Sequence, residues 1–324
     1  MTEILERIPA LIIGYSRVNG VERIVRELIA QEISSIYIAI DGQKQENKDT
    51  YSAFQNLRVR LSQEFPETKI TWWLRDKNLG CAVSVITAID WIFQSENRAV
   101  ILEDDLSVGS SFHQYSREAF RYLKENENVL LFTGTRLHTL TEARIAPGTL
   151  SPYPVIWGWG TTDEKWKLLR SIYYSDICKL KCSSDMRVNS FWKVGLARSL
   201  NHRIDAWDVP LAYYLLKEKK LCLLPPINMI SNLGFDEFAT HTNEKVWPLG
   251  IKIENEFSAP LKIDQNEYLK TSEYKFMNNR VYKIGRKRII SWPLELIRQT
   301  LDGSKKINKL ANSIDQVEKN GIFY

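Results

Sequence analysis

The first half of the chain alternates short apolar runs with stretches in which apolar residues recur at helical spacing. Residues 9–15 form an apolar run that ends in a glycine-containing turn, and the apolar positions that follow recur every three to four residues. The alternation continues through predicted strands at 36–40, 70–74 and 100–102, and through predicted helices at 51–65 and 82–93. Strands that alternate with helices form parallel sheets. The order therefore predicts an α/β fold with a mostly parallel central sheet flanked by helices.

The second half of the chain has a less regular pattern. Apolar runs at 129–134 and 221–224 predict strands, a helical stretch is expected at 209–216, and turn formers are dense from 138 to 154. We see no internal repeat and no low-complexity linker. We divide the chain into a main domain at 1–260, with halves at 1–125 and 126–260, and a C-terminal extension at 261–324.

Polar side chains follow each predicted strand of the first half. They are Ser16 and Arg17, Asp41, residues 75–78, and Glu103 to Asp105. Parallel strands bring these ends to one edge of the sheet, where open α/β sheets bind their ligands. The first turn, residues 14–17, lacks the GxGxxG spacing of a dinucleotide site, and no phosphate-loop motif occurs.

The three consecutive carboxylates of Glu103, Asp104 and Asp105 are the strongest chemical signal. Like charges side by side repel one another, so the triplet needs either solvation by water or a cation among the carboxylates. A hard divalent cation prefers carboxylate oxygens and keeps positions open for phosphate oxygens. A solvated acidic loop is the alternative.

Charge and composition narrow the class of protein. The net charge of +5 is too small to indicate nucleic-acid binding, and residues 270–324 carry most of it, with 12 Lys and Arg against 5 Asp and Glu. The four cysteines have no metal-site spacing and indicate reduced thiols in a cytoplasmic protein. We see no signal peptide and no run long enough to cross a membrane.

Several motifs occur in an order that is familiar. The acidic triplet at the end of a buried strand resembles the metal motif of GT-A fold glycosyltransferases, and in particular the N-acetylglucosaminyltransferase I-like branch. The later motifs are similar to those of bacterial family 2-type glycosyltransferase-like proteins. They are the Trp-Gly-Trp-Gly loop at 157–160, Trp-Asp at 207–208, Asn-Leu-Gly-Phe at 232–235 and Ala-Thr-His-Thr at 239–242. The resemblance covers roughly residues 8–245.

The resemblance implies a role for each matching residue of the first half. Asp105 would bind the metal and bridge it to the donor diphosphate, Asp104 would contact the donor ribose or the metal shell, and Glu103 the donor sugar. Asp41 would bind the nucleobase, although Asp-Gly is also a plain turn signal. Arg17 would lie against the nucleotide. Two more residues at the same sheet edge, Tyr15 and Asn78, complete the expected donor site.

The matching residues of the second half imply an acceptor site. Asp208 would be the general base that deprotonates the acceptor hydroxyl, with Asp205 as the runner-up; the alternative for Asp208 is a helix cap. Trp157 and Trp159 would contact a sugar with their ring faces, unless they are core residues. His241 would complete the metal or phosphate site, or else be a surface histidine.

Taken together, these features predict a metal-dependent, inverting glycosyltransferase that moves a hexosyl or N-acetylhexosaminyl group. Its donor would be a nucleotide sugar, with UDP-sugars expected first, and its cofactor Mn²⁺ or Mg²⁺. The acceptor would be a glycan or lipid-linked glycan in bacterial surface polysaccharide or glycoconjugate synthesis. The alternatives are a sugar-phosphate nucleotidyltransferase and a glycan- or partner-binding protein without turnover.

The basic extension allows two interpretations. Basic residues at 283–288 precede an apolar, Trp-containing segment at 289–294, a pattern that suits the anionic inner face of the cell membrane. The alternative, which we favour, is a helix that packs its apolar side on the catalytic domain.

Overall fold

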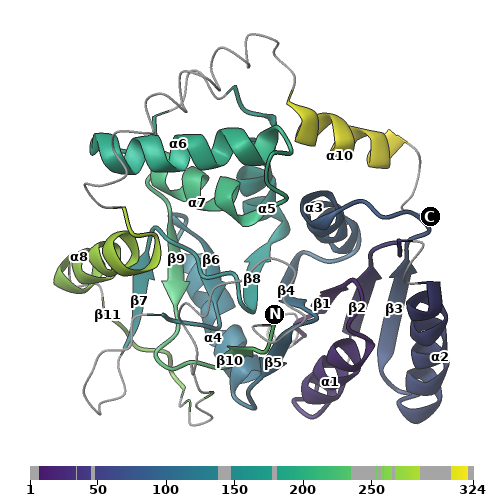
Figure 1. Cartoon of the computed structure of the whole chain (residues 1–324). Coiled ribbons are helices and arrows are strands. Elements are labelled where there is room, and N and C mark those ends of the chain that lie inside the picture. The colour runs from purple at the N-terminus through teal and green to yellow at the C-terminus, as the bar shows by residue number, and fades with distance from the viewer. Residues whose placement is uncertain are drawn as a thin grey trace.

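A nine-stranded, mostly parallel sheet with helices on both faces forms the centre of the computed structural model (Figure 1). The structure describes residues 7–33, 35–44, 48–137, 147–176, 181–234, 253, 257, 259–264, 267–284 and 308–319. The strand order is β11-β7-β9-β6-β8-β4-β1-β2-β3, and β5 and β10 form a separate antiparallel pair. The predicted α/β class with a mostly parallel sheet is confirmed.

The first half forms the elements that its hydrophobic pattern predicts. They are β1 (Ala10–Gly14), α1 (Val18–Ile29), β2 (Ser35–Ile40), α2 (Lys48–Glu64), β3 (Lys69–Leu74), α3 (Cys81–Ile92), β4 (Arg98–Glu103), β5 (Leu106–Val108) and α4 (Phe112–Glu125). β1 is buried throughout and pairs in parallel with β2 on one side and β4 on the other. Such two-sided burial explains why its sequence is a continuous apolar run.

The second half adds strands of both directions to the same sheet. It contains β6 (Val129–Thr133), β7 (Gly148–Ser151), β8 (Trp159–Thr162), α5 (Asp163–Arg170), the 3-10 helix η3 (Ser171–Tyr174), α6 (Met186–Leu200), α7 (Asp208–Lys217), β9 (Leu221–Leu224), β10 (Ile230–Asn232) and β11 (Ile263–Asp264). β8 lies between β4 and β6 and is antiparallel to both. The strands of the two halves therefore form one continuous sheet.

Alternate residues of the central strands point to two apolar layers. Leu11 and Ile13 of β1 pack in the layer under α3, α6 and α7, whereas Ala10 and Ile12 pack in the layer under α1 and α4. This alternation is the period-two pattern of a strand that is covered on both faces.

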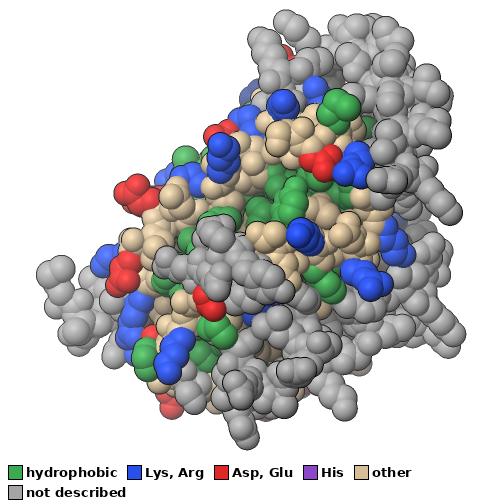
Figure 2. Space-filling view, turned by 90° about the vertical axis from the view of Figure 1, so that its left-hand side faces the viewer, with side chains coloured by type: hydrophobic (Ala, Val, Ile, Leu, Met, Phe, Trp, Pro, Cys, Tyr) green, Lys and Arg blue, Asp and Glu red, His purple; other side chains and the backbone are tan. Residues whose placement is uncertain are grey.

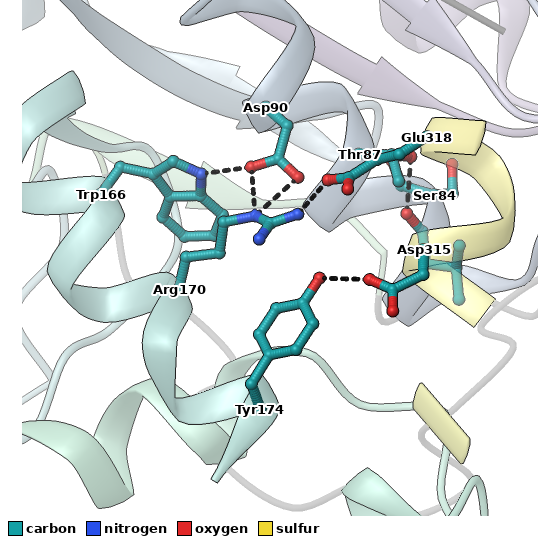
Figure 3. Close-up of polar contacts among 9 residues, drawn as sticks. Ser84, Thr87, Asp90, Trp166, Arg170, Tyr174, Asp315 and Glu318 are labelled. Atoms are coloured by element: carbon teal, nitrogen blue, oxygen red, sulfur yellow. Dashed lines mark hydrogen bonds and ion pairs between the residues drawn. The ribbon is translucent and has the colours of Figure 1, made fainter. Parts of the chain in front are cut away.

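The C-terminal extension contributes three helical segments: α8 (Glu267–Phe276), the π-helix η5 (Met277–Val281) and α10 (Lys309–Lys319). α10 lies against α3, α6 and η3, with Leu310 and Ile314 fully buried. Its polar side is held as well: Glu318 pairs with Arg170, and Tyr174 donates a hydrogen bond of 3.1 Å to Asp315 (Figure 3). The apolar side of α10 thus packs on the core, whereas the packing predicted for the segment at 289–294 stays a prediction.

The basic segment 285–294 lies outside the described residues, so membrane contact stays a prediction. No helix of the described chain is both long and apolar enough to cross a bilayer.

Candidate active site

The carboxyl ends of β1, β2 and β4 open into a cleft of about 980 Å³. β2 and β3 lie on one side of β1, and β4 lies on the other side. The order in which the chain adds strands to the sheet therefore reverses between β1 and β4. This is the switch point at which α/β sheets bind ligands. All seven residues expected at the donor and metal site in the first half line this cleft: Tyr15, Arg17, Asp41, Asn78, Glu103, Asp104 and Asp105.

Asp104 holds the turn that follows β1. Its carboxylate accepts hydrogen bonds from the backbone N–H groups of Tyr15, at 2.9 Å, and Arg17, at 3.4 Å. The Arg17 guanidinium lies 3.4 Å from the same carboxylate and 3.9 Å from that of Asp105. Burial raises the pKa of Asp104, while these donors act against the rise. Asp104 therefore shapes the cleft floor and orients Arg17.

Asp105 is more open than Asp104, with 24% of its side chain exposed against 10%. Burial and the neighbouring Asp104 raise its pKa to about 6. The turn after β10 closes on it: Leu233 donates its N–H to the Asp105 carbonyl at 2.8 Å, and a Cβ on Gly234 would lie 2.4 Å from its carboxylate. The Asn-Leu-Gly part of the motif at 232–235 is thus placed beside the acidic triplet.

Glu103 is the acid with the least compensation. No described residue donates a hydrogen bond to its carboxylate or forms an ion pair with it. Burial raises its pKa well above the usual range, and the charges of Asp105, Asp104 and Asp208 raise it further. A buried acid in such a place either holds a proton or faces a cation.

Asp41 is engaged by the loop that leads into α3. Its carboxylate accepts hydrogen bonds from the N–H groups of Leu79, at 3.0 Å, and Gly80, at 3.2 Å, and from the Asn78 side chain, at 3.2 Å. It also accepts one from Gly42. The turn-forming role is therefore present, and a contact with a nucleobase stays a prediction.

Asp205, the runner-up as base, caps α3. Its carboxylate accepts hydrogen bonds from the N–H groups of Cys81, at 2.8 Å, and Ala82, at 2.7 Å. Both oxygens are therefore directed at a helix N-terminus, where a carboxylate is stabilised. Asp205 also lines the cleft, and the choice between Asp205 and Asp208 as the base stays a prediction.

Asp208 begins α7 and lines a second cavity of about 300 Å³. Its charge raises the pKa values of Glu103 and Cys81, both of which line the cleft. Burial raises the pKa of Asp208 itself, and the backbone N–H groups of Asp208 and Val209 counteract the rise. The capping and the catalytic interpretation therefore overlap, because a capped carboxylate is still a proton acceptor.

The expectation that Trp159 offers a ring face to a sugar is wrong. Trp159 is 1% exposed, pairs with Ile101 in the sheet, and stacks on Trp207 with ring centroids 5.7 Å apart. The glycines beside it allow close packing: a Cβ on Gly160 would lie 2.4 Å from the Phe132 ring. Trp157 is half-buried against both apolar layers, and its sugar contact stays a prediction.

His241 lies outside the described residues, so its expected role is not addressed. Within the described ranges, no cluster of three or more His, Cys, Asp or Glu side chains forms a ready metal site. The residues fit a divalent cation that takes Asp105 and completes its shell with phosphate oxygens, because Asp105 is partly open and Glu103 accepts no hydrogen bond from a described residue. They do not fit a cage built from protein ligands alone.

Two residues that line the cleft were not predicted from the sequence. Arg23 and Lys44 also line the cleft and add positive charge beside the acids. Arg23 lies on α1 five residues after its start, a position that a helical projection from the β1 turn could have indicated. The residues around the second cavity carry no local signal, because they come from α6, α7 and the segment after η5.

No curated protein matches the chain in sequence. Among similar solved structures, UDP-glucose pyrophosphorylase complexed with UDP-glucose is 8% identical, over 67% of this chain and 89% of that chain, with a TM-score of 0.37. UTP-bound UGPase from Acinetobacter baumannii is 10% identical, over 67% and 85%, with a TM-score of 0.33. At these values the likenesses carry no conclusion about activity.

The sequence match is more direct. Residues 21–146 match the model of glycosyltransferase family 25, described as LPS biosynthesis protein. The matched range holds α1, the acidic triplet and β6. The N-acetylglucosaminyltransferase I-like branch and the bacterial family 2 type stay predictions, whereas the family 25 match supports an enzyme of the glycosyltransferase class.

Proposed function

We propose that the protein transfers a sugar from a nucleotide-diphosphate donor to a hydroxyl acceptor, with inversion at the anomeric carbon. The observation that carries the proposal is the position of Asp208. It lines a cavity separate from the cleft, yet its charge acts on Glu103 and Cys81 in the cleft. A base that lines one cavity and whose charge acts on residues of the other suits a reaction between two bound substrates.

The donor side is the cleft at the switch point. Arg17, Arg23 and Lys44 supply positive charge for a diphosphate, and the Asp104 carboxylate fixes the backbone of the turn that carries Arg17. The volume of about 980 Å³ accommodates a nucleotide sugar.

The proposed step is a single displacement. Asp208 accepts the proton of the acceptor hydroxyl, the acceptor oxygen forms a bond to the anomeric carbon, and the bond from that carbon to the diphosphate oxygen breaks. The electron pair and the negative charge leave with the nucleoside diphosphate. The raised pKa of Asp208, caused by burial, makes its carboxylate a stronger base than an exposed aspartate.

A divalent cation, Mn²⁺ or Mg²⁺, would be held by Asp105. It would supply charge neutralisation for the departing diphosphate. Glu103 lies next to this position and would contact the donor sugar.

The setting we propose is the synthesis of bacterial lipopolysaccharide. The family description names this process. A lipid-linked or free glycan is the corresponding acceptor, and work at the inner face of the cell membrane is consistent with it.

The test compares Asp208→Asn with Asp205→Asn. Release of nucleoside diphosphate from a panel of nucleotide sugars is followed with Mn²⁺ and deacylated lipopolysaccharide core as acceptor. We expect Asp208→Asn to lose about 10²–10⁴-fold in transfer rate while it still binds the donor. Asp205→Asn should change stability more than rate, since Asp205 caps α3. Transfer at a near wild-type rate by Asp208→Asn would rule out the proposed base.

A further inference from the structure

The cavity beside Asp208 has a character different from that of the cleft. It encloses about 300 Å³ between α6, the start of α7 and Tyr282. The cleft is lined by acids and bases, whereas this cavity is lined mainly by apolar and aromatic side chains, with Asp208 and Arg198 as its charged residues. In the space-filling view from the α8 side, apolar side chains are exposed at the centre of the face and Lys and Arg side chains border them (Figure 2).

Aromatic rings that pack against one another form one wall of the cavity. Tyr282 meets Trp192 edge-on, with centroids 4.7 Å apart, and Phe191 meets Trp192 edge-on at 5.3 Å. Trp192 is stacked in turn on Tyr153 at 5.7 Å. Tyr282 directly follows the π-helix at 277–281, a form that is frequent at functional sites. Trp192 is 3% exposed and supports the wall from behind, so the half-buried rings of Phe191 and Tyr282 are the ones that suit the apolar face of a sugar ring.

Gly195 keeps the cavity open. It lies within α6, where glycine is less favourable than alanine because it loses more conformational freedom on folding. A Cβ at this position would meet only the Val209 side chain, at 3.0 Å, and would otherwise point into open space. No close packing against backbone therefore requires glycine here. The space that its missing side chain leaves belongs to the cavity.

Arg198 supplies a positive charge one turn after Gly195. It is exposed, lines the cavity and forms no ion pair with any described residue. A guanidinium pairs well with a carboxylate or phosphate because it can donate two parallel hydrogen bonds. Asp208, on the α7 side, presents a carboxylate that can accept a hydrogen bond from a hydroxyl.

We propose that this cavity is the acceptor subsite and that it binds a monosaccharide unit carrying a phosphate or carboxylate group. The aromatic wall contacts the sugar ring, Arg198 binds the anionic group, and Asp208 accepts from the hydroxyl that reacts. The inference rests on the proposed function, because Asp208 is the base there. It assigns the acceptor to a surface other than Trp159, which is buried.

The test measures binding in the absence of any donor. Glucose, glucose 6-phosphate, glucuronic acid and inorganic phosphate are titrated by saturation-transfer NMR and calorimetry into the wild type, Gly195→Leu, Arg198→Ala and the control Arg187→Ala. We expect one of the charged sugars to bind about ten-fold more tightly than glucose, and the better of the two identifies the anionic group. Arg198→Ala should remove this preference, and Gly195→Leu should abolish sugar binding by filling the cavity.

The control and the outcomes separate this proposal from the proposed function. Arg187 lies on the same helix, outside the cavity, so Arg187→Ala should bind like the wild type. Arg198 is exposed, so its variant should stay folded even if Gly195→Leu does not. The subsite is overturned if no sugar binds, if Arg198→Ala keeps the preference, or if inorganic phosphate binds as tightly as glucose 6-phosphate. If charged sugars bind as expected and Asp208→Asn still transfers, only the proposed base fails.

Discussion

Carboxylate side chains serve different purposes in this protein, according to their partners. Asp41, Asp104 and Asp205 accept backbone N–H groups and hold loops or a helix start. Glu103 is buried without such donors from described residues. The sequence identifies these acids as a group, because each follows a strand or precedes a helix. It could not show which oxygens were already used, since the donors come from residues up to 124 positions away.

The Asp90 carboxylate leads to a prediction about how the free energy of unfolding depends on pH. It is buried among Trp166, Arg170 and Glu318, and accepts hydrogen bonds from the Trp166 indole at 2.7 Å and Arg170 at 2.8 Å (Figure 3). Burial raises its pKa from 3.8 to about 6, despite the opposing charge of Arg170. The folded state thus binds the proton more tightly than the unfolded state between these pH values. Its contribution to stability is complete below pH 3.8 and is lost as pH rises through 6.

The measurement is urea unfolding of the wild type and Asp90→Asn from pH 4.5 to 7.5. We expect the free energy of unfolding of the wild type, relative to the variant, to fall as pH rises to about 6 and then to level off. A difference that is constant across this range would show that Asp90 does not titrate there.

At the scale of elements, the hydrophobic pattern was most informative where strand and helix alternate. Every predicted element of the first half is present, with ends within a few residues of those expected. The insertion of β8 between β4 and β6 could not be foreseen, because Trp159 to Thr162 is short and its partners are far away in sequence. The prediction for Trp159 was wrong for the same reason. The glycines on either side of it allow close packing in the core rather than contact with a sugar.

The helix α10 gives a prediction at this scale. Ile314 is fully buried against the core, while Gln316 on the same helix is exposed. Ile314→Ala should lower the free energy of unfolding by about 2–5 kcal/mol, because it removes buried contacts and leaves a cavity. Gln316→Ala is the control on the exposed side of the same helix. It should change the free energy of unfolding by no more than about 0.5 kcal/mol. Equal unfolding midpoints in urea for both variants would mean that α10 does not stabilise the fold.

At the scale of the whole molecule, one sheet carries residues from both halves to the candidate site. The cleft could be predicted from sequence, because parallel strands bring their carboxyl ends to one edge. The second cavity could not, because it needs α6, α7 and Tyr282 to meet in space. Asp208 lines the second cavity, and its charge acts on Glu103 in the cleft. The division of the chain at residues 125 and 260 stays a prediction.

The central claim is that the cleft binds a nucleotide sugar with the help of a cation at Asp105. The most direct measurement is calorimetric titration of a panel of nucleotide sugars into the wild type and Asp105→Asn, with Mn²⁺ and with EDTA. We expect at least one nucleotide sugar to bind the wild type with Mn²⁺, and either EDTA or Asp105→Asn to weaken that binding by about ten-fold or more. Absence of binding by every nucleotide sugar, or binding that neither EDTA nor Asp105→Asn changes, would contradict the account.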